Sequence, residues 1–106
     1  MRQLIEENIV LTKPKLMSFI NQAFSSSEIE IKTENGSAKI DRGIYWINDI
    51  CKSYLQDEYV KNIIYSLILK YGIFKYDPKG YSGRIVYYEY DFDNKIWNIY
   101  NKPKIL

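Results

Sequence analysis

Histidine is absent from the sequence, and cysteine occurs once, at Cys51. Histidine is the usual general base near neutral pH and the commonest metal ligand in proteins, so the chain lacks the side chain that most often fills either role. Cys51 has no imidazole to activate it, which predicts a structural thiol instead of a nucleophile. One cysteine cannot form an internal disulfide, and we therefore expect a reducing, cytoplasmic location.

Long apolar runs are missing as well. No segment approaches the roughly 18 consecutive apolar residues that span a bilayer, so no membrane partner is expected. The apolar run near the N-terminus is interrupted by Glu6 and Glu7, which argues against a secretory signal.

The motifs of common enzymes are incomplete. The stretch "KGYSGR" lacks the spacing of glycine-rich phosphate loops. Asp91 and Asp93, in "YDFDNK", have the spacing of a calcium loop, but the other ligands and the closing glutamate are missing, which favours a turn. We therefore expect a chain that is not an enzyme and that holds no metal and no cofactor.

Tyrosine is abundant, with 11 residues in a chain of 106, and the formal net charge is +2. The isoelectric point near 8.5 lies below the value of about 9 that marks dedicated nucleic-acid modules. The length fits a single domain over residues 1–106. Isoleucine, lysine, tyrosine and asparagine have AT-rich codons, and their abundance suggests a viral or mobile-element gene.

The N-terminal part is expected to be helical. Residues 1–11 fit a short helix or an extended arm, and residues 13–24 fit a helix that Thr12 caps, with Pro14 in its first turn. We interpret residues 1–24 as an N-terminal segment that serves for dimerisation.

The middle of the chain predicts a hairpin followed by a helix. Isoleucines alternate with charged residues before the turn pair Asn35-Gly36, which indicates a β-hairpin over residues 28–41. Asp41 is a suitable N-cap, and the apolar residues after it recur at helical spacing, which predicts a helix over 43–55.

Residues 57–71 allow two interpretations. Val60, Ile63, Ile64, Leu67, Ile68 and Tyr71 match the helical template, and Gly72 follows where a left-handed residue ends a helix. The β-branched and aromatic content also suits a buried strand. The length of the segment favours the helix. Extended segments then follow at 73–77, 84–91 and 95–101, the last of them within a C-terminal strand and tail over 95–106.

The order helix, short turn, helix and hairpin over residues 43–91 resembles the winged-helix branch of the helix-turn-helix superfamily. The resemblance is carried by Ile50-Cys51 in "NDICKSY" and by Gly72 with Ile73-Phe74 in "LILKYGIF". It implies an α+β fold with three helices, an N-terminal β-hairpin and a C-terminal antiparallel hairpin as the wing.

The same resemblance implies sequence-dependent binding of double-stranded DNA by a small, homodimeric transcriptional regulator. The helix at 57–71 would enter the major groove, and the hairpin tip would lie near the backbone or the minor groove. The implied DNA-binding residues are Tyr59, Lys61, Asn62, Tyr65, Ser66, Lys75, Lys79, Tyr81 and Arg84.

A second interpretation remains open. The polar residues of 57–71 also fit the solvated face of an amphipathic helix, and Tyr87, Tyr88 and Tyr90 fit a half-buried sheet. Tyrosine offers a large contact area at low entropic cost. The alternative function is therefore that of an inhibitor or accessory protein that binds a host protein through a tyrosine-rich surface.

Overall fold

One antiparallel sheet organises the chain. The computed structural model describes residues 2–34, 36–47, 50–52, 58–78 and 85–103, and within them it contains eight strands and two helices. In chain order the elements are β1 (Leu4–Ile9), α1 (Lys13–Ala23), β2 (Glu28–Thr33), β3 (Gly36–Asp41), β4 (Ile44–Ile47), β5 (Ile50–Lys52), α2 (Glu58–Tyr71), β6 (Ile73–Asp77), β7 (Val86–Asp91) and β8 (Ile96–Tyr100). None of these helices is long and apolar enough to cross a membrane.

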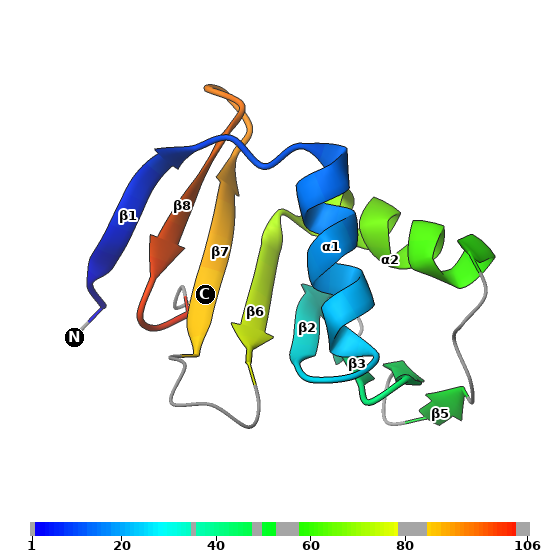
Figure 1. Ribbon diagram of the computed structural model, residues 1–106. Helices are drawn as coiled ribbons and strands as arrows, with labels where there is room; N and C mark the ends of the chain where they lie inside the picture. Colours follow the sequence, from blue (N-terminus) through cyan, green and yellow to red (C-terminus); the bar gives the residue numbers. More distant parts are fainter. Residues whose placement is uncertain (1, 35, 48–49, 53–57, 79–84, 104–106) are drawn as a thin grey trace.

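Two meanders are joined in the middle of the sheet. The strand order is β1-β8-β7-β6-β2-β3-β4-β5, so β2–β5 form one half, and β6–β8 with β1 form the other. The halves meet where β2 pairs with β6. Each helix carries the chain from an edge strand back to this junction: α1 leads from β1 to β2, and α2 leads from β5 to β6 (Figure 1).

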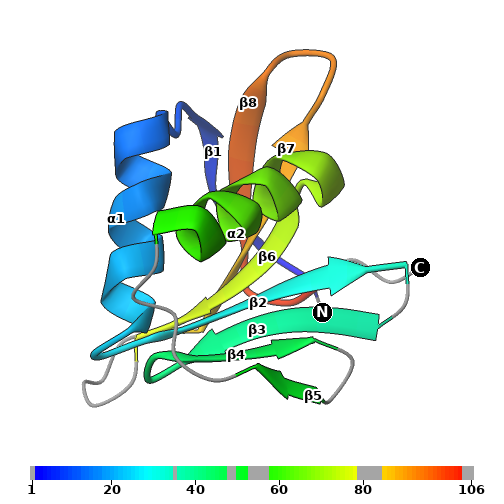
Figure 2. The same cartoon turned by 90° about the vertical axis from the view of Figure 1, so that its right-hand side faces the viewer.

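Both helices cover the same face of the sheet and contact one another (Figure 2). The alternation in β2 explains why: Ile29 and Ile31 are buried under the helices, while Glu28 and Glu30 point to the other side. The core contains Leu16, Ile20, Ala23, Ile29, Ile31, Ala38, Ile40, Tyr45, Ile64, Ile68, Phe74, Tyr88, Trp97 and Ile99.

Aromatic rings extend this core along β6, β7 and β8. Phe74 stacks on Tyr88 with ring centroids 4.7 Å apart, and Trp97 meets Phe74 edge-on at 5.4 Å. Phe19 of α1 lies 5.7 Å from the Tyr88 ring and covers the cluster from the helix side. Tyr88 is therefore a core residue, as the sheet-packing interpretation predicts, and Trp97 is buried beside it.

Several expected elements are present. The hairpin at 28–41 forms β2 and β3, the helix at 13–24 forms α1, and residues 58–71 form a helix instead of a strand. Thr12 caps α1, since its Oγ1 accepts a hydrogen bond from the backbone N–H of Lys15 at 3.4 Å. The region 1–11 contains β1, which pairs with β8 in the sheet.

The predicted helix at 43–55 is wrong. Arg42 and Gly43 both have positive φ values, 51° and 77°, and make the tight turn that returns β4 alongside β3. The β-branched and aromatic residues of β4, "IYWI", suit a strand, and Tyr45 pairs there with Ile40. Cys51 accordingly lies in β5 and not on a helix.

The winged-helix fold is overturned by these findings. The described residues contain two helices, not three, and the helix that should precede the recognition helix is replaced by β4 and β5. The supposed wing, β6 with β7, does not project from the molecule, because β6 also pairs with β2 and β7 also pairs with β8. It is an internal hairpin of the sheet.

The junction between α2 and β6 depends on Gly72. Its φ is +68°, its N–H donates to the Ile68 carbonyl at 2.9 Å, and its own carbonyl accepts from the Tyr90 N–H at 2.7 Å. A Cβ at this position would lie 2.8 Å from the Cζ of Phe92. A side chain here would therefore have two separate costs, left-handed backbone strain and a close contact with Phe92.

We predict that Gly72→Ala lowers the free energy of unfolding by about 1–3 kcal/mol, measured by urea denaturation. Phe92→Ala removes the closest contacts, while the Tyr90 Cβ stays 3.1 Å from the added Cβ. In that background the cost of Gly72→Ala should fall toward the backbone strain of about 1–2 kcal/mol. A Gly72→Ala protein as stable as the wild type would contradict this account.

Candidate interaction surface

The implied DNA-binding residues of α2 divide between two environments. Tyr59, Asn62 and Ser66 lie exposed on the outer face of the helix, where they line a shallow hollow with Ile63 and Leu67. The Asn62 amide donates to the Glu58 carbonyl at 2.9 Å, and the Ser66 hydroxyl donates to the Asn62 carbonyl at 3.0 Å.

Lys61 and Tyr65 instead lie beside α1 and the turn that follows it. The Lys61 side chain is only 17% exposed, with its Nζ 3.3 Å from the Glu58 Oε1 and 5.2 Å from the Phe24 ring. Tyr65 lies under the Lys13 ammonium at 5.2 Å. Both side chains are thus directed to contacts within the protein and away from a partner.

Lys75 is on the opposite side of the molecule, on the sheet face that the helices leave uncovered. Lys79, Tyr81 and Arg84 lie outside the described residues. The implied set therefore does not assemble into one surface in the part of the chain that the structure describes.

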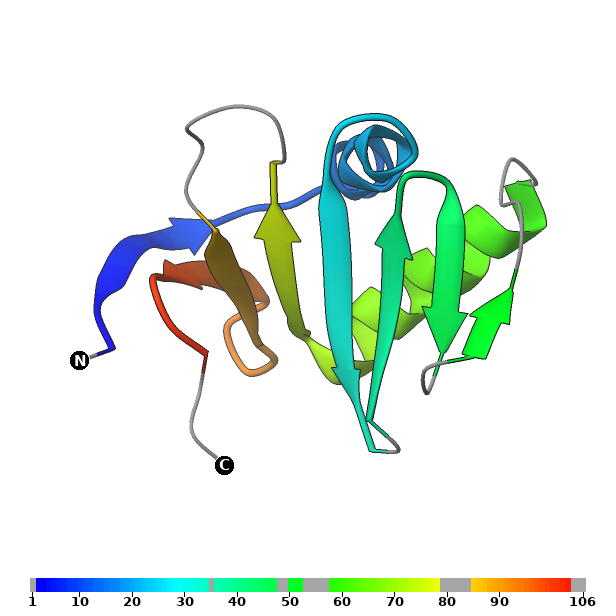
Figure 3. The same cartoon turned by 90° about the horizontal axis from the view of Figure 1, so that it is seen from below.

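The uncovered side of the sheet, which we call the open face, carries a continuous row of paired residues. In Figure 3 the strands β3 and β4 lie in front of α2. Directly paired residues in antiparallel strands point to the same side of the sheet. The register therefore aligns one residue from each of six strands that are neighbours in the sheet, in the order β8, β7, β6, β2, β3 and β4. This central row consists of Tyr100, Tyr87, Lys75, Glu30, Lys39 and Trp46.

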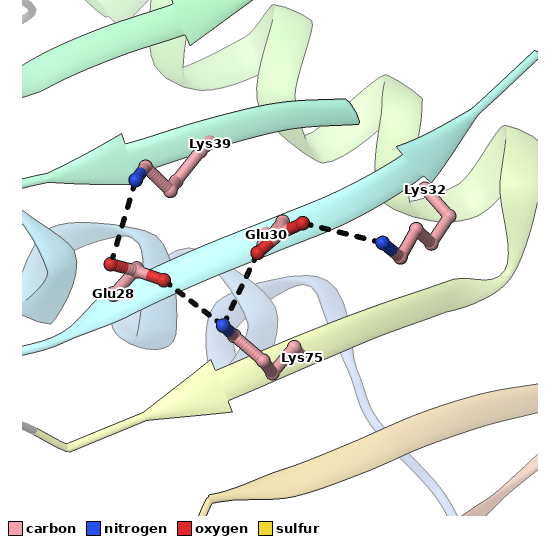
Figure 4. A network of polar contacts seen from close by, with 5 residues as sticks. All are labelled: Glu28, Glu30, Lys32, Lys39 and Lys75. Atoms are coloured by element: carbon pink, nitrogen blue, oxygen red, sulfur yellow. Dashed lines mark hydrogen bonds and ion pairs between the residues drawn. The ribbon is translucent and has the colours of Figure 1, made fainter. Parts of the chain in front are cut away.

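A network of ion pairs occupies the middle of the open face (Figure 4). The Lys75 Nζ lies 3.3 Å from the Glu28 Oε1 and 3.2 Å from the Glu30 Oε2. The Lys32 Nζ is 3.4 Å from the Glu30 Oε1, and the Lys39 Nζ is 3.9 Å from the Glu28 Oε2. The Glu28 side chain is only 8% exposed, so the centre of the network is largely withdrawn from water.

The network shifts the pKa of its members. Partial burial alone would raise the pKa of Glu30, but hydrogen bonds and charges from Lys75 and Lys32 outweigh the burial, and the net shift is downward. Burial alone would lower the pKa of Lys75, yet its hydrogen bonds to Glu30 and Glu28 and their charges raise it. Both residues are therefore held in the charged state.

Two hollows flank Glu30 on the open face. One, of about 130 Å³, is lined by Glu30, Lys32, Ile73, Lys75, Tyr87 and Pro103. The other, of about 210 Å³, is lined by Glu30, Ser37, Lys39 and Trp46. The Lys39 Nζ lies 5.9 Å from the Trp46 ring. Each hollow thus combines an aromatic wall with lysine side chains and shares one carboxylate with the other.

The charges of the open face do not favour a polyanion. The register places Lys32, Lys39 and Lys75 on this side, and Arg2 reaches it through its ion pair with Glu89. The anions are Glu28, Glu30, Asp41, Asp77, Glu89 and Asp91, placed there by the register. Arg2 pairs with Glu89 and lies over the Tyr100 ring at 3.5 Å. Among these named residues six anions accompany four cations, and each of the four cations has an anionic partner.

The turn at Asp91 confirms the structural interpretation of "YDFDNK". The Asp91 Oδ1 accepts from the backbone N–H groups of Asp93 and Asn94, at 3.0 and 3.2 Å. Its Oδ2 accepts from the Asn94 side chain at 2.8 Å. These hydrogen bonds lower the pKa of Asp91 and close the β7–β8 turn.

Comparisons with protein-family models, with curated proteins and with solved structures find no match for this chain. The interpretation of the open face therefore rests on its own geometry. Sequence reasoning missed this surface because it assigned Trp46 to a helix. The alternation of glutamate and isoleucine in "EIEIK" was the available signal for a charged face opposite the core.

We predict that Glu30→Gln reduces the acid sensitivity of the fold. Because the pKa of Glu30 is lower in the folded chain than its ordinary value of 4.5, its stabilisation is present above pH 4.5 and is lost as pH falls through the folded value. Glu30→Gln should cost about 1 kcal/mol near pH 7, and the difference from the wild type should shrink below pH 4.5.

Thermal or urea unfolding at a series of pH values measures this difference. Glu34→Gln, in the exposed β2–β3 turn, is the matched control. A constant offset between Glu30→Gln and the wild type at every pH would show that the ion network does not hold the pKa of Glu30 down.

Proposed function

We propose that this chain binds another protein through the open face. The observation that carries the proposal is the central row, in which tyrosines at one end and Trp46 at the other flank a partly desolvated ion network. Tyrosine and tryptophan are enriched among the residues that dominate binding energy at protein interfaces. The hollows beside Tyr87 and Trp46 provide places for two side chains of a partner.

The charge distribution supports a protein partner over a nucleic acid. Nucleic-acid affinity grows with the number of phosphates that cationic side chains neutralise. The lysines of the open face are already paired with glutamates, and further carboxylates surround them. A phosphate backbone would have to displace these pairs and approach the further carboxylates of this face, whereas a protein can present charges of both signs.

Duplex DNA binding remains a prediction, but the winged-helix fold on which that prediction depended is overturned. The paired helices and the projecting wing on which it depended are replaced by β4, β5 and an internal hairpin. A chain with one cysteine suits a reducing compartment, and we place the proposed interaction in the cytoplasm.

The test is capture of a binding partner by the intact chain and by surface variants. We expect Trp46→Ala and Tyr87→Ala each to weaken binding at least about tenfold, because the few residues that dominate an interface cost about 2 kcal/mol or more when truncated. Tyr59→Ala, on the outer face of α2, is the matched aromatic control and should bind as the wild type does. Thermal melts of all variants confirm that they are folded.

The salt dependence of binding separates the two classes of partner. Binding through the open face should change little between 50 and 200 mM salt, while DNA binding should fall steeply over the same range. Duplex DNA binding that collapses at the higher salt, or partner capture that survives both open-face variants, would overturn the proposal.

A further inference from the structure

The exposed residues of α2 form a symmetric pattern. The six solvent-facing positions of this helix are Glu58, Tyr59, Asn62, Ser66, Leu69 and Lys70. The other residues of α2 are buried or half-buried. The exposed positions are placed symmetrically about Ile64, so a second, antiparallel α2 centred on Ile64 would bring them into register with one another.

Each residue in this register meets a complementary one. Tyr59, which is 71% exposed, aligns with Leu69 of the second copy, which is 38% exposed. Asn62 aligns with Ser66, and the reverse alignments follow from the two-fold symmetry. The spacing of Tyr59, Asn62, Ser66 and Leu69 is that of the apolar seam in a pair of packed helices.

The polar pair in the middle keeps unused hydrogen-bonding capacity. Asn62 donates one amide N–H to the Glu58 carbonyl, which leaves its second N–H and its Oδ1. The Ser66 hydroxyl donates within its own helix and can still accept. An Asn62 N–H can therefore donate to the Ser66 Oγ of the other copy, on both sides of the axis.

The hollow on α2 also has a fitting occupant. It measures about 330 Å³ and is lined by Tyr59, Asn62, Ile63, Ser66 and Leu67. Leucine side chains on a helix lean toward its N-terminus. Leu69 of an antiparallel copy therefore leans from its position opposite Tyr59 toward Asn62, into this hollow.

The charges at the two ends of α2 favour the antiparallel direction. Glu58 lies in the first turn and Lys70 in the last. Antiparallel packing brings Glu58 of one copy to the same end of the interface as Lys70 of the other, and it also opposes the two helix dipoles. Parallel packing would place like charges together.

We infer that α2 is a self-association surface, on which a second copy of this chain packs antiparallel about a two-fold axis level with Ile64. The surface lies on the helix-covered side of the sheet, so the dimer leaves both open faces accessible. This inference rests on the pattern of α2 alone and is independent of the protein-binding proposal. One helix pair is a small interface, which predicts a weak, micromolar dimer.

Sedimentation equilibrium of the full chain, over about 10–500 µM, measures the association. We expect the wild type to dimerise and Tyr59→Asp and Leu69→Arg each to weaken dimerisation at least tenfold. Val10→Asp is the matched control, because Val10 is 72% exposed and lies outside α2. It should dimerise as the wild type does.

A mixture of the two variants tests the antiparallel register. When Tyr59→Asp is mixed with Leu69→Arg, the introduced aspartate and arginine face one another in the proposed dimer, and the remaining Leu69 faces Tyr59. The mixture should therefore associate more tightly than either variant alone. A monomeric wild type at the highest concentration, unchanged association of the single variants, or a mixture no tighter than its components would each overturn the inference.

Discussion

The pairing of β2 with β6 is the contact on which the rest of the structure depends. The helix-covered face and the open face of this strand pair contribute differently to the stability and register of the sheet. On the helix side, Ile31 opposes Phe74, and both are fully withdrawn from water. Burying side chains of this size stabilises by about 1.5–3 kcal/mol each, whereas a partly exposed ion pair contributes about 1 kcal/mol or less. The apolar pair therefore supplies the energy. The glutamates and Lys75 on the open face supply the register, because a shift by one residue would turn Lys75 into the core.

The local elements could be read from the sequence where the signal was itself local. The cap at Thr12, the hairpin around Asn35-Gly36 and the periodicity of α2 involve residues within one or two turns of one another. The strands β4 and β5 could not be read in the same way. Their isoleucines recur at helical spacing, and the strand conformation follows from the positive φ values at Arg42-Gly43 and from an available edge on β3. The order of the sheet depends on pairs of strands that are far apart in the chain, such as β2 with β6. The sequence pattern of a single strand does not identify the strand with which it pairs.

The candidate interaction surfaces could also be predicted only in part. Helical periodicity correctly placed Tyr59, Asn62 and Ser66 on an exposed face, because exposure follows from the angle around a helix. It failed for Lys61 and Tyr65, which lie beside α1 and the turn after it, since the position of a second helix is a tertiary property. The open face combines residues from six strands, so it became visible only when their register was known. The sequence reasoning treated the eleven tyrosines as one surface feature, but the nine that the structure describes divide between the aromatic core, the open face and the helices.

The pairing of β1 with β8 has a consequence for how the chain is made. The strand β1, Leu4–Ile9, pairs with β8, Ile96–Tyr100, which lies at the other end of the described residues. Because synthesis proceeds from the N-terminus, β1 emerges from the ribosome long before β8 has been made. The meander from β2 to β5 has neighbours that are close in sequence and can form early, but the far edge of the sheet has to wait. Until β8 leaves the exit tunnel, the backbone N–H and C=O groups along this edge of β1 have no strand to pair with and stay open to chaperones or to other nascent chains.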